Sequence, residues 1–397
     1  MIESLSIDGF GPFPVRRPGS ADELGALVRE AAAAGQGIYP VGGRTMLDLG
    51  HPPAGPGVAV DTTGLSAVVD YPARDMTVTV QAGVTLAALQ SALAAENQWL
   101  PVDVPEPARA TVGGAIAANA SGPRRYGSGT LRDYVIGIRF VTDEGVEVKG
   151  GGRVVKNVAG YDLMKLQTGA LGTLGVLTEV TLKVKPRPEE SAAVVVGCGA
   201  AAVGPLLDLL HGSNSRPAAV ALFNAPAWRA AGGPPVPADW VLAAGFEEKR
   251  VTVDWQVATF LKELKPTAAR DAAEVRGPDA ARVWSAATDL QTRPASRFVW
   301  KAAVRPSETA AVVAAVRTGP EILVHSEPLN GIVWVHTADD RPPGGDVNWT
   351  VRRCPAEWKT RLPVWGRPRG DWELMRHVKR TLDPKNVFNP GRLFAEA

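Results

Sequence analysis

The segment VGGRTMLDLG, residues 41–50, places two adjacent glycines directly after a short apolar run that contains Pro40. Glycine pairs let backbone N–H groups approach an anion such as phosphate, although a single pair also fits an ordinary turn. The residues that follow are rich in Pro and Gly, and the next apolar run, GVAVDTT at residues 57–63, is typical of a strand. A dinucleotide-binding turn of the Rossmann type is followed at once by a helix, so the sequence excludes that fold here.

A helix and a strand are predicted directly before this glycine loop. Ser20 and Glu23 have the spacing of a capping box, and apolar residues recur behind them at helical spacing until Gly35. The run GIYPV at residues 37–41 then predicts the strand that leads into the loop.

Length and composition indicate a globular chain of two domains. The chain has 397 residues, of which 45% are hydrophobic, and its formal net charge of +2 does not favour nucleic-acid or membrane-surface binding. No apolar run reaches the roughly 20 residues that span a bilayer, and the first residues lack the pattern of a signal peptide. Cys198 and Cys354 are far apart and form no metal or iron–sulfur spacing, so we expect a cytoplasmic protein.

The pattern of predicted elements changes near residue 188, after the stretch KPRPEE. Before this point we expect several more strands, with DEG at residues 143–145 as a hairpin turn. Beyond it, strand-like and helix-like runs alternate in an α+β pattern with antiparallel strands. Ten of the eleven tryptophans follow the boundary, which fits core filling and also leaves open that some rings line a cofactor or a partner surface.

Four separate segments carry residues suited to an extended, mostly apolar cofactor with a pyrophosphate. They are residues 41–50, 105–127, 154–180 and 383–393. Gly113 and Gly114 open a predicted helix, whose positive N-terminal end favours phosphate, and the small residues after them allow a flat ring to lie close. Each glycine cluster alone could be only a turn, whereas their joint occurrence in this order is much more specific.

These segments resemble the flavoproteins of the vanillyl-alcohol oxidase type, which carry a PCMH-type FAD-binding domain. SGPRRYGSGTLRDYVIGIRFVT, VVKNVAGYDLMKLQTGALGTLGVLTEV and NVFNPGRL are similar to the FAD-binding subunit of glycolate oxidase. The resemblance implies an α+β fold in which residues 1–188 form an FAD domain of two α+β subdomains. It further implies an antiparallel-sheet α+β cap domain at residues 189–374, and a C-terminal segment, residues 375–397, that packs back on the FAD domain.

By this resemblance the first loop cradles the pyrophosphate of FAD, residues 105–127 run beside the flavin ring, and residues 169–177 embrace the adenosine half. The implied FAD-binding residues are Val41, Gly42, Gly43, Arg44, Thr45, Met46, Thr111, Gly113, Gly114, Asn119, Ser121, Gly172, Gly175, Val176 and Leu177. Lys156 and Tyr161 are further candidates for a flavin contact, with simple packing as the equal alternative.

Many relatives attach the flavin covalently through a histidine in the first loop. Here Arg44 and Thr45 occupy that neighbourhood. His51 follows only after the loop has closed, and neither cysteine lies in a cofactor segment. The sequence therefore predicts FAD that dissociates.

Oxidation of a 2-hydroxy acid requires a base for the hydroxyl proton and a cation for the carboxylate. The candidate bases are His325 and His336, which could face each other across a hairpin turn at EPLN, although histidines on strands are often structural. Arg392 is a candidate anion holder. Arg124 and Arg125 are two more, for which salt links at the subdomain seam are the equal alternative, and no metal site is predicted.

The resemblance implies an FAD-dependent oxidoreductase subunit that oxidises a small 2-hydroxy acid such as glycolate. The sparse set of candidate bases supports a second hypothesis, an accessory subunit that relays electrons for a homologous catalytic FAD subunit and an iron–sulfur subunit. Such partners could bring a cytoplasmic chain to a membrane that it does not itself span. A third hypothesis is an FAD-binding scaffold without turnover.

Overall fold

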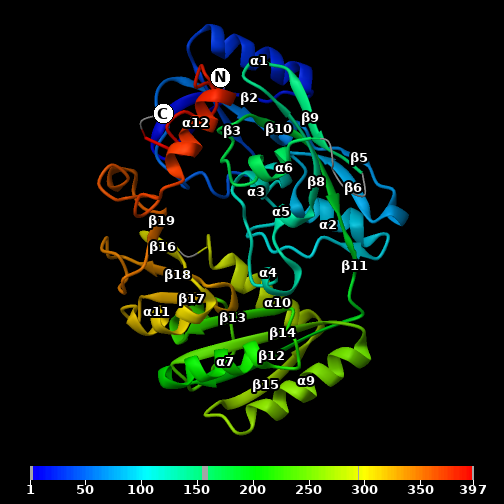
Figure 1. Cartoon of the computed structure of the whole chain (residues 1–397), viewed down its shortest axis with the longest axis vertical. Helices are drawn as coiled ribbons and strands as arrows, with labels where there is room; N and C mark the ends of the chain where they lie inside the picture. The colour runs from blue at the N-terminus through cyan, green and yellow to red at the C-terminus, as the bar shows by residue number, and fades with distance from the viewer. Residues whose placement is uncertain (1–2, 154–159, 294, 396–397) are drawn as a thin grey trace.

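A computed structural model describes residues 3–153, 160–293 and 295–395. Figure 1 shows two units stacked along the long axis, and both ends of the chain lie in the same unit. The predicted α+β fold class is confirmed, since the first unit is built on two sheets and the second on one large antiparallel sheet.

The first sheet holds the strand that leads into the glycine loop. Its strands are β1 (Ser4–Ile7), β2 (Phe10–Arg16), β4 (Gly57–Asp61) and β3 (Gly37–Val41), in this order. Strand β4 pairs in parallel with both β2 and β3. Helix α1 (Ala21–Ala33) covers the sheet and begins where predicted, because the Ser20 hydroxyl accepts a hydrogen bond from the backbone N–H of Glu23 at 3.2 Å. The Glu23 carboxylate accepts from Gly19 N–H instead of closing the box on Ser20.

The second sheet is antiparallel and carries the short helices of the cofactor segments. Its strands are β5 (Val68–Asp70), β6 (Thr77–Gln81), β10 (Val176–Lys183), β8 (Val135–Val141) and β9 (Glu147–Gly151), in this order. The predicted hairpin joins β8 to β9, with Gly145 at φ 69° in its turn. The remaining elements of this unit are α2 (Leu86–Ala94), α3 (Val112–Ala117), α4 (Arg125–Ser128), α5 (Leu131–Tyr134), α6 (Leu163–Gln167) and the pair β7 (Gln98–Trp99) and β11 (Lys185–Pro186).

The second unit, which we call the cap, contains an eight-stranded antiparallel sheet. Its strands are β15 (Arg270–Arg276), β12 (Glu190–Cys198), β14 (Trp240–Glu248), β13 (Ala219–Asn224), β17 (Leu323–Glu327), β18 (Ile332–Thr337), β16 (Phe298–Ala303) and β19 (Trp349–Arg353), in this order. One face is covered by α7 (Val203–Gly212), α9 (Arg250–Leu264) and α11 (Thr309–Ala315). The other is covered only in its β12–β14–β13 half, by α8 (Ala225–Ala230) and α10 (Gly277–Asp289).

The C-terminal segment returns to the first sheet. Beyond α12 (Trp372–Leu382), Phe388 forms a parallel bridge with Ile38 of β3 and is fully buried. Ile38 N–H donates to Val387 O at 2.7 Å, and Asn389 N–H donates to Ile38 O at 2.8 Å. In Figure 1 this red segment lies beside the blue N-terminal strands. Among the helices described, none is long and apolar enough to cross a bilayer.

Candidate functional site

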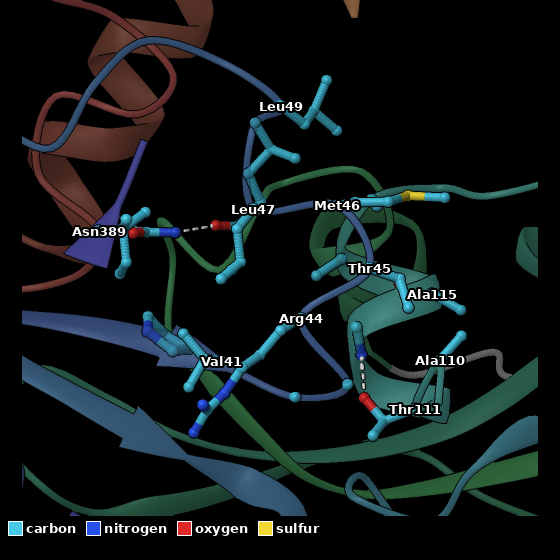
Figure 2. Close-up of a pocket in the computed structure, with 18 of the residues that line it drawn as sticks. Val41, Arg44, Thr45, Met46, Leu47, Leu49, Ala110, Thr111, Ala115 and Asn389 are labelled. Carbon is cyan, nitrogen blue, oxygen red and sulfur yellow. Dashed lines mark hydrogen bonds between the residues drawn. The ribbon is translucent and has the colours of Figure 1, made fainter. Parts of the chain in front are cut away.

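Two adjoining open cavities, of about 740 and 470 Å³, form a groove in the first unit. Both are lined by Pro40, Val41, Gly42, Gly114, Ala117 and Leu171. The first continues along residues 43–47 and past Ala115 to Asn389, as Figure 2 shows, and the second continues along residues 172 and 175–177. The groove therefore draws its walls from all four of the segments grouped in the sequence.

The glycine loop is pressed against the segment that precedes α3. A Cβ atom added at Gly43 would lie 1.8 Å from the carbonyl oxygen of Arg109, so no other residue fits without moving that backbone. Arg44 has φ 59°, and its guanidinium turns toward Asp61 at 3.3 Å and Glu3 at 3.1 Å. The loop thus presents its backbone to the groove while the Arg44 charge is already paired elsewhere.

Helix α3 forms the floor of the groove with small residues. Its first turn is capped by Thr111, whose hydroxyl accepts from Gly114 N–H at 3.2 Å (Figure 2). A Cβ added at Gly114 would meet only that hydroxyl, at 3.0 Å, whereas one at Gly113 would meet Ala82 at 2.8 Å. Gly113 is therefore required by packing, and Gly114 faces the open groove.

Two buried cations hold the loop that closes the first cavity. Arg392 donates to the carbonyl oxygens of Leu47, Leu49 and His51, with the Leu49 and His51 contacts at 2.7 and 2.6 Å. Lys359 of the cap side donates to Gly50 O at 2.9 Å and to Asp48 O. Burial lowers the pKa of both side chains, although the carboxylate of Asp8 beside them acts in the opposite direction. These contacts place Arg392 as a residue that positions the loop.

A small cavity of about 310 Å³ joins the groove to the half of the cap sheet that α8 and α10 do not cover. It is lined by Met46 and Leu49, which also line the groove, and by Trp334 and Arg352 of the cap. The Trp334 ring lies between charged neighbours, because Lys301 Nζ is 4.8 Å and Arg352 Cζ is 5.6 Å from its centroid. Burial lowers the pKa of Arg352 to about 10.

His325 and His336 lie next to this cavity, at the predicted hairpin of β17 and β18. Their Nε2 atoms are 3.2 Å apart, and the His325 ring stacks on Trp334 with centroids 5.8 Å apart. Burial lowers the pKa of both rings, that of His336 to about 3. Both histidines are buried, and the Nδ1 atom of His336 has no hydrogen-bond partner among the described residues.

The seam between the two units is bridged by Arg124. This arginine donates to Asp103 of the first unit and to Glu247 of the cap at 2.7 to 3.0 Å. Although burial alone would lower the pKa of Arg124, the two carboxylates raise it. Of the two alternatives for Arg124, the structure favours the salt link. Arg125 donates only to the Ser121 hydroxyl, at 3.3 Å, in the described part of the chain.

Comparison with known proteins finds matches for two parts of the chain that line the groove. Residues 12–151 match the model of an FAD binding domain, and residues 366–393 match the C-terminal domain of FAD linked oxidases. These two parts of the chain are therefore similar to the FAD-binding and C-terminal domains of FAD linked oxidases. The cofactor of the chain is FAD, as the sequence predicted.

Several relatives of this chain are named for 2-hydroxy acid chemistry. Glycolate oxidase subunit GlcE of Escherichia coli K12 is 41% identical over 147 residues, which is 37% of this chain and 41% of the relative. D-2-hydroxyglutarate dehydrogenase of Xanthomonas citri pv. viticola is 36% identical over 185 residues, 47% of this chain and 39% of the relative. Glycolate oxidase subunit GlcD of Bacillus subtilis is 33% identical over 178 residues, 45% of this chain and 38% of the relative. The matches thus span about two fifths of these relatives.

The fold is also shared with a solved structure of alkyldihydroxyacetonephosphate synthase. The TM-score is 0.68 and the identity 18%, over 96% of this chain and 77% of that chain. At this identity the likeness concerns the fold alone.

The groove fits FAD on the geometry of the residues themselves. Gly114 leaves space that a side chain would fill, and the alanines after it offer a flat floor for a ring. The backbone of residues 42–46 and Thr111 would face the pyrophosphate, and residues 175–177 would face the adenosine half. Bound there, FAD would supply an acceptor for two electrons.

The proposed FAD-binding residues fall into two groups. Thirteen line the groove: Val41, Gly42, Gly43, Arg44, Thr45, Met46, Thr111, Gly113, Gly114, Gly172, Gly175, Val176 and Leu177. Asn119 and Ser121 lie at the end of α3 outside both linings, and they remain predictions. Tyr161 is 91% exposed and lines neither cavity, and Lys156 lies outside the described residues.

Sequence reasoning did not single out the charged residues of the cap face. Lys301, Glu327 and Arg352 all point to the uncovered side of the sheet, as does Trp334. A signal for Lys301 was present, since Val299, Lys301 and Ala303 alternate with the core residues Phe298, Trp300 and Ala302.

Proposed function

We propose that this chain is an FAD-dependent oxidoreductase subunit that oxidises a small 2-hydroxy acid. The names of its relatives support this substrate class, since they refer to glycolate, D-2-hydroxyglutarate and D-lactate. The observation that carries the proposal is the cavity shared by Met46 and Leu49 of the groove and by Arg352 of the cap. A cation there can hold the substrate carboxylate beside the cofactor.

The proposed catalytic residues have different surroundings. Arg392 is fully occupied by loop carbonyls, so its role in the proposed reaction is to position the FAD-binding loop. His325 and His336 stay proposed proton acceptors, and Trp334 is the ring that separates His325 from the cavity.

Anaerobic mixing of the FAD-loaded protein with glycolate, D-lactate or D-2-hydroxyglutarate tests the proposal. We expect the visible absorption of the oxidised flavin to bleach with at least one of the three acids. A flavin that only dithionite reduces, with no acid and no partner able to do so, would instead indicate a scaffold without turnover.

A second candidate function is that of an accessory subunit that relays electrons. It is favoured by the sparse set of candidate bases, since His325 and His336 are both buried and neither lines the cavity. The relatives GlcE and GlcD are named as subunits. We propose a homologous FAD subunit and an iron–sulfur subunit as partners. Bleaching that requires these partners in addition to the acid would support this alternative.

A further inference from the structure

The uncovered half of the cap sheet carries a concentration of ionisable side chains on one face. On β17, β18, β16 and β19 the alternate residues Val324, Val333, Val335, Trp300 and Val351 belong to the apolar core. The residues between them point to the FAD domain, because side chains alternate along a strand. They include Lys301, His325, Glu327, Trp334 and Arg352. Apolar packing does not explain this composition.

Three cations on or near this face have no carboxylate within salt-bridge distance among the described residues. Lys301 and Arg352 lie against the Trp334 ring, and Arg125 of α4 faces them from the FAD domain with one hydrogen bond to Ser121. Arg124, a neighbouring arginine at the seam, is by contrast paired with two carboxylates. Buried charges are normally paired, so the cluster has an unmet need for negative charge.

Glu327 is the carboxylate nearest to Lys301 and Arg125 in this cluster. It is 4% exposed, and the Trp334 side chain lies close enough to lower the pKa of Glu327 by hydrogen bonding. Asp103, the next acid, is already bound by Arg124. The acid that acts on Arg352 is Asp48, which lines the same cavity but is already paired with Arg353. Glu327 is therefore the one carboxylate among these three acids that forms no ion pair within the described residues, and it faces Lys301 and Arg125.

We propose that Lys301, Arg352 and Arg125 bind a small carboxylate anion beside Trp334. The inference rests on the proposed function, for which it supplies the substrate carboxylate site. Arg352 lines the cavity beside Met46, so it is the residue that a ligand meets first. Lys301 and Arg125 add charge from the two sides of the seam.

The same geometry couples anion binding to proton uptake. The charged or titratable groups that face Lys301 are Arg352, Glu327 and Arg125. Burial, with Arg352, lowers the pKa of Lys301 to about 7, and burial raises the pKa of Glu327 to about 7. An anion raises both pKa values by favouring the protonated forms, so near neutral pH its binding takes up protons.

Titration calorimetry with oxalate tests the site without turnover, because oxalate carries carboxylates but no oxidisable hydroxyl. The FAD-loaded chain is titrated in Mops and in Tris, whose ionisation enthalpies differ, so that the number of protons taken up is measured along with the affinity. We expect saturable binding with net proton uptake near neutral pH.

Arg352→Met should weaken oxalate binding about 10- to 100-fold, the effect of losing a hydrogen bond to a charged group. Glu327→Gln should keep binding but reduce proton uptake. Arg361→Met is the matched control, since Arg361 also lies over a tryptophan of the cap, 5.5 Å from the Trp358 centroid, but is exposed and outside the cluster. FAD content and circular dichroism establish that each variant is folded, and Arg352→Lys should recover part of the affinity if Arg352→Met does not fold.

The outcomes separate this inference from the proposed function. Unchanged oxalate affinity in both folded Arg352 variants, or no saturable binding to the wild type, overturns the carboxylate site even if glycolate bleaches the flavin. Selective loss in the Arg352 variants supports the site even if no hydroxy acid reduces the flavin.

Discussion

The Nε2 atoms of His325 and His336 lie 3.2 Å apart inside the cap. At this distance one ring donates its proton and the other accepts it, so at least one of the two rings must be neutral. Burial is the main reason that both pKa values are low, with the neighbouring ring adding to the effect at His325 and Arg353 adding to it at His336.

Acidification is therefore expected to destabilise the protein through this pair. The pKa of His336 is about 3 in the folded chain and returns toward 6.5 on unfolding, so between these values the unfolded state binds more protons. The free energy of unfolding therefore decreases as the pH is lowered. Well below pH 6.5, each such group contributes a decrease of about 1.4 kcal/mol per pH unit. His336→Gln removes one of these protonations, and its thermal midpoint should fall less than that of the wild type between about pH 7.5 and about pH 5.5.

The control for this comparison is His211→Gln, on the exposed side of α7. This variant should lose as much stability on acidification as the wild type. Equal losses in the wild type and in His336→Gln would show that the buried pair is not the source of the acid sensitivity.

Gly114→Val is expected to reduce the FAD retained per chain to less than about one tenth of the wild-type value, because the side chain would fill the groove. The variant should still fold, since a Cβ at this position meets only the Thr111 hydroxyl. FAD absorbance per protein and far-ultraviolet circular dichroism measure the two properties separately.

Gly43→Ala provides the contrasting variant. Its Cβ would lie 1.8 Å from Arg109 O, so the loop must move and the thermal midpoint of the FAD-free chain should fall as well. Full FAD content in Gly114→Val would mean that the cofactor does not pass over α3.

Arg392→Met is expected to weaken FAD binding although its guanidinium points to loop carbonyls. Without Arg392 the oxygens of Leu47, Leu49 and His51 lose their donor, and the loop that lines the first cavity loosens. Fluorescence titration of the FAD-free chain should show about a tenfold or greater loss of affinity, the effect of several charge-assisted hydrogen bonds. If Arg392 instead held a substrate carboxylate, oxalate affinity would fall while FAD affinity stayed the same.

The sequence predicted those parts of the fold whose causes are local. Ser20 caps α1, as its spacing from Glu23 indicated, and the helix predicted to open at Gly113 and Gly114 is α3. The loop after β3 was separated from a Rossmann turn because no helix follows it, and the structure agrees. The four glycine segments are distant in the sequence, so local propensities could not show that they meet. Their resemblance to known flavoproteins allowed them to be grouped.

The charged cap face could not be predicted in the same way. Lys301, Glu327 and Arg352 become neighbours only through the strand order β17–β18–β16–β19, which is not the order of the sequence. Strand β19, WTVRR, alternates apolar and polar residues only over its first four positions and ends in two arginines, so its strand signal is weak. Strand β15 was missed for a related reason, because most of its residues are exposed at the sheet edge.

Dissociable FAD remains a prediction that a simple experiment can test. Cys198 and Cys354 are buried in the core of the cap, and neither lines the groove. Among the described residues that line the two cavities, none is a histidine or a cysteine. Acid precipitation followed by centrifugation should therefore leave the yellow colour in the supernatant. Colour that stays in the washed pellet would indicate a covalent bond.

Arg124→Met is expected to destabilise the seam between the FAD domain and the cap. The substitution leaves Asp103 and Glu247, both nearly buried, without their shared cation. Breaking a buried ion pair by removing one partner costs about 3–5 kcal/mol, mainly because charge is left uncompensated. Arg124→Met combined with Asp103→Asn and Glu247→Gln removes that charge and should recover most of the thermal midpoint. If the triple variant is as unstable as Arg124→Met, the loss arises from packing of the arginine side chain on Trp99, which its guanidinium covers at 5.3 Å, and not from unpaired carboxylates.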